Sequence, residues 1–211
     1  MKLTVNTFLS LDGVMQGPGG KDEDTSGGFE RGGWLVPSAD DDMGRIVDSW
    51  FDEADAILLG RTTFEMMQAY WEQVTEPDNA VATALNGLPK YVVSSTLTDP
   101  TWNNTTVLSQ DFLEAIAELK AESGRELQVH GSYQLARALH DAGLVDEYRL
   151  LYFPVVVGQG KRLFDGGAVP SAFTLVRSET TSAGAVHMVL QPKPFAAGDF
   201  EVRDGKEGVR E

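Results

Sequence analysis

The chain contains no cysteine among its 211 residues. This absence excludes disulfide bonds, thiolate nucleophiles, iron–sulfur clusters and cysteine zinc sites, and the three histidines lack metal-ligand spacing, so we expect no metal. A cysteine-free chain fits a reducing compartment, and we expect a cytoplasmic location. The longest apolar run, Leu150–Val157, has the length of a strand and falls far short of the ~20 residues of a membrane span. We therefore expect no membrane association.

Positive charge is also scarce. Seventeen Lys and Arg stand against 32 Asp and Glu, which gives a net charge of −15. Such a field repels DNA, RNA and anionic lipids, because their binding depends on neutralising phosphates. The length and the 42% of hydrophobic residues are typical of one globular domain. A small molecule is therefore a better expected partner than nucleic acid.

Strand and helix signals alternate through residues 1–191, which predicts an α/β fold of three layers, α/β/α. Several strands are continuous apolar runs, as in a sheet covered on both faces. The expected sheet has eight strands, mostly parallel, with an antiparallel C-terminal hairpin. Residues 192–211 are polar and non-periodic, and we expect them to form a loose tail. The expected strands are Leu3–Leu11, Ala54–Leu59, Lys90–Ser95, Thr105–Leu108, Leu127–His130, Glu147–Val157, Phe173–Thr181 and Ala185–Gln191.

Four helices are indicated by apolar residues at helical spacing. The first buries a stripe from Met43 to Phe51, with Ser38 as its expected cap and the Asp40–Asp42 run in its first turn. The second covers Thr63–Trp71 and the third carries Phe112 to Leu119. The fourth covers Tyr133–Ala142 and ends at Gly143, where a left-handed glycine would close a Schellman motif.

Two strand-to-helix junctions have the composition of a phosphate site. Gly60, Arg61 and Thr62 combine a flexible backbone, a forked cation and a hydroxyl at a helix start. Gly131, Ser132 and Tyr133 follow the strand candidate Leu127–His130 and have a similar design at the start of a helix. Each junction read alone is equally explained as a helix cap. Because the carboxyl ends of parallel strands meet at one edge, we expect both junctions to face the same ligand.

Three further segments carry candidate groups. Ser94 and Ser95 follow a buried strand and could bond a ribose or its phosphate, although such pairs often only form turns. Asp12 ends the first strand and is the candidate catalytic carboxylate, with a structural turn as the alternative. The glycine-rich loop at 17–20 could close over a ligand. Two of the aromatic side chains, Trp34 and Trp50, could stack on a flat heterocycle, although core packing explains Trp50 as well.

These segments, with LLGRTTFE, YVVSS, VHGSYQLARAL and GLVDEYRLLYFPVVVGQGKRLF, come in the order seen in the dihydrofolate reductase-like superfamily. The chain resembles the branch that contains the reductase domain of riboflavin biosynthesis more closely than dihydrofolate reductase itself. The resemblance covers about residues 1–191, and residues 192–211 lie outside it. It implies an NADPH-dependent enzyme with the fold predicted above, and it leaves room for a homodimer. The deaminase domain often fused to this reductase is absent from the sequence.

The resemblance also implies roles for single residues. Gly60, Arg61 and Thr62 would lie at the NADPH phosphates, with Arg61 pairing to the phosphate that distinguishes NADPH from NADH. Ser94 and Ser95 would lie near the 2′-phosphate, and the Gly131 junction would hold the pyrophosphate. Gly13, Val14 and Met15 would lie beside the nicotinamide, and Asp12 near the substrate.

The predicted activity is a hydride transfer from NADPH to a C=N type group of a pyrimidine- or pterin-like substrate, as in a 5-amino-6-(5-phosphoribosylamino)uracil reductase. Asp12, or water held by it, would supply the proton. Asp48 could face the buried stripe of its helix, but nothing in the sequence identifies it as a pterin-binding carboxylate. The alternative is a nucleotide-binding, dimerising module that has lost turnover.

Overall fold

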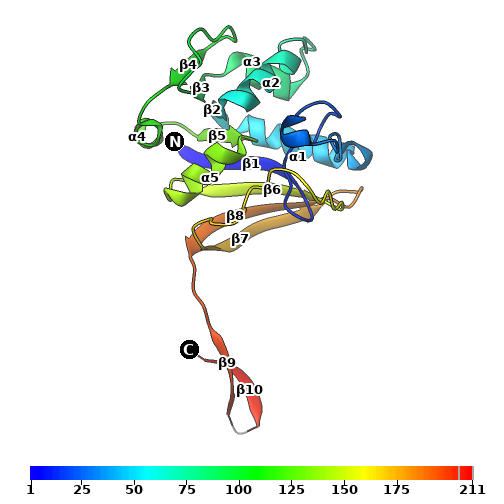
Figure 1. Ribbon diagram of the computed structural model, residues 1–211, viewed down its shortest axis with the longest axis vertical. Helices are drawn as coiled ribbons and strands as arrows, with labels where there is room; N and C mark the ends of the chain where they lie inside the picture. The colour runs from blue at the N-terminus through cyan, green and yellow to red at the C-terminus, as the bar shows by residue number, and fades with distance from the viewer. Residues whose placement is uncertain (204, 211) are drawn as a thin grey trace.

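A computed structural model of the chain describes residues 1–203 and 205–210. Eight strands form one sheet in the order β4-β3-β2-β5-β1-β6-β8-β7 (Figure 1). The first six strands of this order are parallel to their neighbours, whereas β8 pairs antiparallel with β6 and β7. The strands of the sheet are β1 (Lys2–Ser10), β2 (Ala54–Gly60), β3 (Lys90–Val93), β4 (Thr105–Leu108), β5 (Glu126–His130), β6 (Glu147–Phe153), β7 (Ser171–Thr180) and β8 (Val186–Pro194). The predicted mixed, mostly parallel α/β sheet with an antiparallel C-terminal hairpin is confirmed.

Helices cover both faces of the sheet, as alternating side chains on the strands require. One face buries Leu3 and Val5 of β1 against the two last helices, and the other face buries Leu151 and Phe153 of β6 against the first. The helices are α1 (Asp41–Asp52), α2 (Arg61–Trp71), α3 (Ala80–Gly87), α4 (Phe112–Ala121) and α5 (Tyr133–Asp141). Two short 3₁₀ turns, Ser26–Gly28 and Val36–Ser38, precede α1.

Helix ends confirm one prediction and correct another. The backbone N–H of Leu144 donates to the Leu139 carbonyl at 3.0 Å, and Gly143 has φ of +65°, so the expected Schellman motif closes α5. Ser38 is not the cap of α1, because it lies in a 3₁₀ turn. The Asp40 carboxylate accepts from the Met43 N–H at 2.8 Å instead. Asp40, expected to interact with the helix dipole, is thus also the N-cap residue of α1.

Helix α3 was not expected from the sequence. Its eight residues, AVATALNG, carry alanines around the whole helix, so the apolar stripe that signals an amphipathic helix is weak. The Asn79 side chain caps it by accepting from the Ala82 N–H at 2.9 Å. Burial of Leu85 against α2 and β2 then holds it in place.

The C-terminal segment corrects the expectation of a loose tail. Strand β8 runs on to Pro194, and a separate antiparallel hairpin follows, made of β9 (Asp199–Arg203) and β10 (Lys206–Arg210). Figure 1 shows this hairpin projecting away from the sheet. None of the helices within 1–203 and 205–210 combines the length and apolar character needed to cross a bilayer.

Candidate functional site

The two predicted junctions lie in direct contact at the carboxyl edge of the sheet, because β2 and β5 are neighbours. The Gly60 N–H donates to Ser132 Oγ at 2.9 Å, and the Ser132 N–H donates to Thr63 Oγ1 at 3.1 Å. Gly131 and Ser132 both have positive φ, +56° and +55°. A Cβ atom at Gly131 would also approach Thr63 Cγ2 to 3.3 Å, so glycine is favoured there. The expectation that one edge unites both junctions is confirmed.

The helix starts at these two junctions lack side-chain caps. Helices α1 and α3 begin under the capping side chains of Asp40 and Asn79, whereas α2, α5 and also α4 have no side-chain cap. The Ser132 hydroxyl, at the cap position of α5, accepts from Gly60 and donates to the His130 carbonyl instead. First-turn N–H groups of both helices are therefore available to an anion, and the helix dipoles favour negative charge there.

Arg61 and the segment after β3 form one end of this edge. The Arg61 guanidinium bonds to Glu65 Oε1 at 2.7 Å and to the Thr96 hydroxyl, and its side chain is 46% exposed. Ser95 is exposed beside them. Ser94 is buried, and its Oγ accepts from the N–H groups of Thr96 and Leu97. Ser94 is thus a turn-forming residue, and Thr96 is the hydroxyl that the structure brings to Arg61.

Asp12 anchors the other end of the edge. Its carboxylate accepts from Ser10 Oγ at 2.7 Å, the Val157 N–H at 3.0 Å and the Gly158 N–H at 2.7 Å, and it pairs with Arg162 at 3.2 Å. Burial raises its pKa, but these hydrogen bonds prevail and hold the pKa well below its ordinary value.

A carboxylate that stays ionised at neutral pH cannot itself donate the proton predicted of it. The contacts of Asp12 assign it to joining the loop after β1 to the loop after β6. Water is the proton source compatible with this ionisation, but the four donors leave the Asp12 carboxylate no open acceptor site to hold it.

Two side chains that the sequence did not single out as site residues, Gln16 and Lys161, tie the remaining loops together. Buried Gln16 donates to the carbonyls of Asp24 and Ser26 and accepts from the Lys161 N–H. Lys161 Nζ pairs with Asp24 at 2.6 Å and lies 5.4 Å from the ring centroid of Tyr133. Lys161 lies in the GQGKR segment at 158–162. This segment lacks the spacing of a phosphate-binding loop, so the sequence did not indicate a role for the lysine.

A cavity of about 370 Å³ opens between these loops and the start of α5. Its volume is in the range of small-molecule sites. It joins the segment beside Gly13 to the segment beside Gly131, because Gln16 and Tyr133 are both in its wall. The lining residues are Gln16, Ser26, Gly27, Phe29, Tyr133, Gln159, Gly160, Lys161, Arg162 and Asp165.

The residues predicted to lie beside the nicotinamide differ in accessibility. Gly13 has open space above it and φ of +78°, so its backbone can be approached closely. The side chains of Val14 and Met15 are buried in the core, and their N–H groups bond to Ser10 Oγ and the Lys161 carbonyl. Any contact of these two residues with a ligand therefore falls to the backbone.

The predicted aromatic substrate contacts are not brought to the cavity. Trp50 is 2% exposed, and its indole N–H donates to His187 Nε2 at 3.3 Å. Its assignment to substrate is wrong, because helical spacing places it in the core under α1. Trp34 is half-buried, packs edge-on against Phe153 and donates to the Gln16 carbonyl. Asp48 is exposed on the outer side of α1, so it does not take part in the site.

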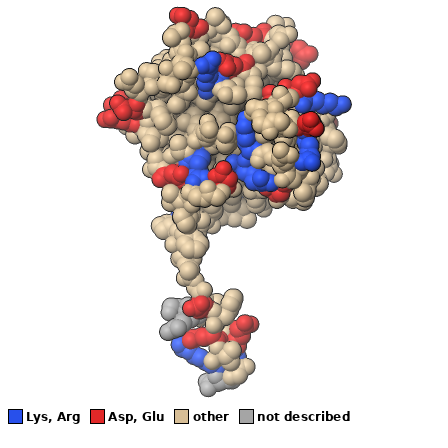
Figure 2. Space-filling view, in the orientation of Figure 1, with Lys and Arg blue, Asp and Glu red and all other residues tan. Residues whose placement is uncertain are grey.

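Basic side chains gather near the cavity although the chain as a whole is acidic. Figure 2 shows Lys and Arg on the side of the molecule where β1 ends and its loop lies. Lys161 and Arg162 line the cavity, and Arg31 bonds to the Val157 carbonyl behind it. Lys161 pairs with Asp24 and Arg162 with Asp12, so both cations are partly neutralised within the chain.

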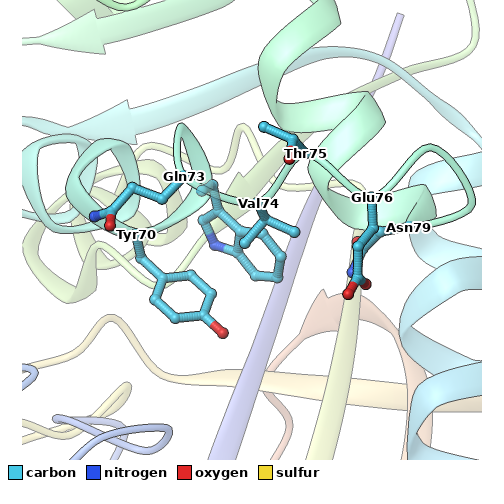
Figure 3. A pocket seen from close by; sticks show the side chains of 7 residues that line it. Tyr70, Gln73, Val74, Thr75, Glu76 and Asn79 are labelled. Carbon is cyan, nitrogen blue, oxygen red and sulfur yellow. The ribbon is translucent and has the colours of Figure 1, made fainter.

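A second hollow of about 380 Å³ lies at the other end of α2 (Figure 3). The 11 residues of α2 place it about 16 Å from Arg61 along the helix. It has no lysine or arginine among its lining residues, which are Tyr70, Trp71, Gln73, Val74, Thr75, Glu76 and Asn79. It is separate from the site described above.

Known proteins resemble this chain over nearly its whole length. It is 28% identical over 190 residues to the uncharacterized protein YyaP of Bacillus subtilis strain 168, covering 89% of this chain and 93% of that protein. A protein of Shewanella sp. PV-4 named for riboflavin biosynthesis shares its fold with a TM-score of 0.69 at 21% identity, over 92% of this chain and 99% of that one. A pyrimidine reductase-like protein of Corynebacterium diphtheriae gives a TM-score of 0.62 at 13% identity, over 92% of each chain. The family described as the RibD C-terminal domain matches residues 1–187, and the chain therefore belongs to that family.

Proposed function

We propose that this protein is an NADPH-dependent reductase that reduces a C=N type group of a pyrimidine- or pterin-like heterocycle. Its family supports a reductase-like role, and the substrate class follows the reaction of 5-amino-6-(5-phosphoribosylamino)uracil reductases that the sequence resembles. The proposal adds the cofactor and the substrate class to that role.

The order of the candidate groups along the sheet edge carries the proposal. The segment predicted to lie near the 2′-phosphate follows β3, and the Gly60 junction predicted at the NADPH phosphates follows β2. The junction predicted to hold the pyrophosphate follows β5, and the segment predicted beside the nicotinamide follows β1. These four strands are consecutive neighbours in the sheet. Three strand spacings of about 4.8 Å give a linear site of roughly 14 Å. Segments scattered over more than 120 residues of sequence are thus in the order of the parts of one extended dinucleotide.

The residues present suit such a cofactor. Arg61, with Thr96 and Ser95 beside it, would bind the 2′-phosphate, and the free N–H groups of α2 and α5 would bind the bridging phosphates. The cavity beside Gly13 and Tyr133 would receive the ring end. When bound, NADPH supplies the hydride.

The chain itself contributes positioning and proton supply. The ion pairs and hydrogen bonds of Asp12, Gln16 and Lys161 hold the cavity wall before any ligand arrives, which reduces the cost of orienting two rings. Buried Phe29 lines the cavity and would exclude water from one side. A water molecule admitted to the cavity would deliver the proton that balances the added hydride, and solvent would reprotonate the hydroxide left behind.

A non-catalytic nucleotide-binding, dimerising module is the second candidate. One observation favours it: among the described residues, no carboxylate that could bind a heterocycle faces the cavity without a partner. Asp12 is occupied by four donors, and Asp165 pairs with Arg137. Binding of NADPH without oxidation in the presence of aminouracils and pterins would select this candidate.

The decisive test is NADPH binding and oxidation by the purified chain and two variants. Arg61→Ala removes the forked cation, and we expect NADPH affinity to fall roughly 10- to 100-fold, since a charge-assisted hydrogen-bond pair contributes about 1.5–3 kcal/mol. NADH affinity should change less than threefold. Arg45→Ala is the matched control, because Arg45 is an exposed arginine on α1 and pairs with Glu179 of β7, away from the site. Equal losses for NADPH and NADH would contradict the role of Arg61, and no binding of either would refute the proposed function.

A further inference from the structure

Among the described residues, the C-terminal hairpin forms an arm that extends away from the rest of the chain (Figure 1). We define the arm as residues 195–203 and 205–210, comprising the linker after β8 and strands β9 and β10. Figure 1 shows it extending beyond the end of the sheet, with the helices gathered over the opposite part of the molecule. A lone two-stranded hairpin is at best marginally stable in water. The arm therefore needs a third surface to be held in this form.

One face of the arm is mainly apolar. Phe200 and Val209 are directly opposite each other in the register, and Val202 follows on the same face, with Glu207 opposite it. They are 76%, 68% and 73% exposed. The other face carries Glu201 and Arg203, which form an ion pair at 2.8 Å. The arm is thus amphipathic, with its apolar side uncovered.

The end of the main sheet offers a matching surface. Strand β7 is the last strand, so one of its edges has no partner strand in the sheet. Leu175 and Val176 are 54% and 53% exposed, at a register irregularity that turns consecutive apolar side chains outward. An unpaired edge with exposed apolar residues is a site where another chain can add.

We propose that the arm binds the β7–β8 hairpin of a second copy of this chain, with its apolar face against Leu175 and Val176. In a twofold dimer, the arm of each copy extends from its own β8 to the β7–β8 hairpin of the other copy. The same contact therefore occurs twice, and it covers the apolar surfaces of both copies. One arm is small compared with interfaces of about 1,200–2,000 Å², and the symmetric doubling brings the contact toward that size.

Charge also favours this segment as the point of contact. Residues 1–191 carry 13 Lys and Arg against 27 Asp and Glu, so two such bodies repel each other. Residues 192–211 carry four against five and are nearly neutral. The arm is therefore the part of the chain that can approach a second acidic body at the lowest electrostatic cost. This inference does not rest on the proposed reductase activity.

The first experiment measures the molar mass of the full chain by sedimentation and light scattering. The wild-type protein should have twice the 22.9 kDa mass of one chain. Phe200→Ser with Val202→Ser should halve the measured mass, with the far-ultraviolet circular dichroism of the body retained. Glu201→Ser with Arg203→Ser is the matched control on the charged face and should remain dimeric. A monomeric wild-type protein, or a dimer that persists in the Phe200→Ser, Val202→Ser variant, would overturn the proposal.

The second experiment uses the absence of cysteine from the chain. Val176→Cys and Val202→Cys are made in separate chains, mixed and oxidised. We expect a disulfide between the two variants, giving a reducible band at twice the mass that neither variant forms alone. No product between the two chains, or a disulfide within one chain that carries both substitutions, would overturn the proposed arrangement.

Discussion

Charged side chains at the two ends of the parallel sheet differ in burial and in pairing. At the amino ends of the central strands, Arg149 makes two hydrogen bonds to Glu126 and a further contact with Glu147, and Lys2 pairs with Glu147 at 2.7 Å. Both carboxylates are 5% exposed. At the carboxyl ends, Arg61 is nearly half exposed and two helices begin without side-chain caps.

The difference separates structure from function. Buried charges that are fully paired within the chain have no free groups with which to bind a ligand. Removing one of them destabilises the fold, because its partners stay buried and unpaired. Donors left open at the opposite edge contribute little to stability, because water satisfies them when no ligand is bound. Substitutions at the amino ends should therefore lower the free energy of unfolding, whereas those at the carboxyl ends should mainly lower affinity for an anion.

Arg149→Met should give the largest effect on stability. It leaves the buried Glu126 and Glu147 with Lys2 as their remaining cation, and we expect the free energy of unfolding to fall by about 3 kcal/mol. Urea denaturation measures this change. Arg177→Met is the control, since Arg177 is 60% exposed and its contact with Glu179 is 3.6 Å long, and it should cost less than about 0.5 kcal/mol. A similar cost for both variants would mean that burial does not distinguish the two ends.

Asp12→Asn should have an intermediate effect that depends on pH. The pKa of Asp12 in the folded protein lies below its ordinary value, so ionised Asp12 stabilises the fold above about pH 4, and this contribution is lost as pH falls toward the folded-state pKa. We expect a loss of about 1–3 kcal/mol at pH 7, where an unmatched hydrogen-bond partner remains.

The stability difference between wild type and Asp12→Asn should therefore shrink between pH 5 and pH 3. Denaturation curves at several pH values measure it. A difference that stays constant over this range would show that the Asp12 contacts do not depend on its charge.

Thr63→Val should give the smallest effect on stability and a clearer one on binding. It removes the hydroxyl that accepts from the Ser132 N–H and joins the two junctions, at a cost of about 1 kcal/mol. Because the start of α5 then loses its fixed position, NADPH affinity should fall several-fold, as titration calorimetry can measure. Thr83→Val, at an exposed position of α3 outside the site, should leave both quantities unchanged. Equal effects of the two substitutions would contradict the coupling of the junctions.

Much of the fold was predictable because local patterns carry it. Each of the eight strands of the sheet begins within two residues of its predicted start. Ends were less predictable: β6 stops at Phe153, since Pro154 removes the N–H that the ladder needs. The arm was missed because a hairpin rich in charge and glycine has the composition of a tail.

The candidate site was predicted in part. Gly60, Arg61, Gly131 and Ser132 were identified from their glycine-containing junctions, and the structure brings the two junctions together, although their role in binding stays a prediction. Trp50 was misassigned because a tryptophan on a helical stripe serves the core. Lys161 was overlooked because no local pattern links it to Tyr133, 28 residues away in the sequence.

The sequence by itself determined which segments become strands and helices, and where glycines leave helix starts open. These properties depend on neighbouring residues, through side-chain alternation and backbone freedom. Only the tertiary structure decided that β2 lies beside β5, that Thr63 meets Ser132, and that the Asp12 carboxylate is held by the loop after β6. Strand order depends on how whole faces pack against helices, and no local pattern along the chain contains that information.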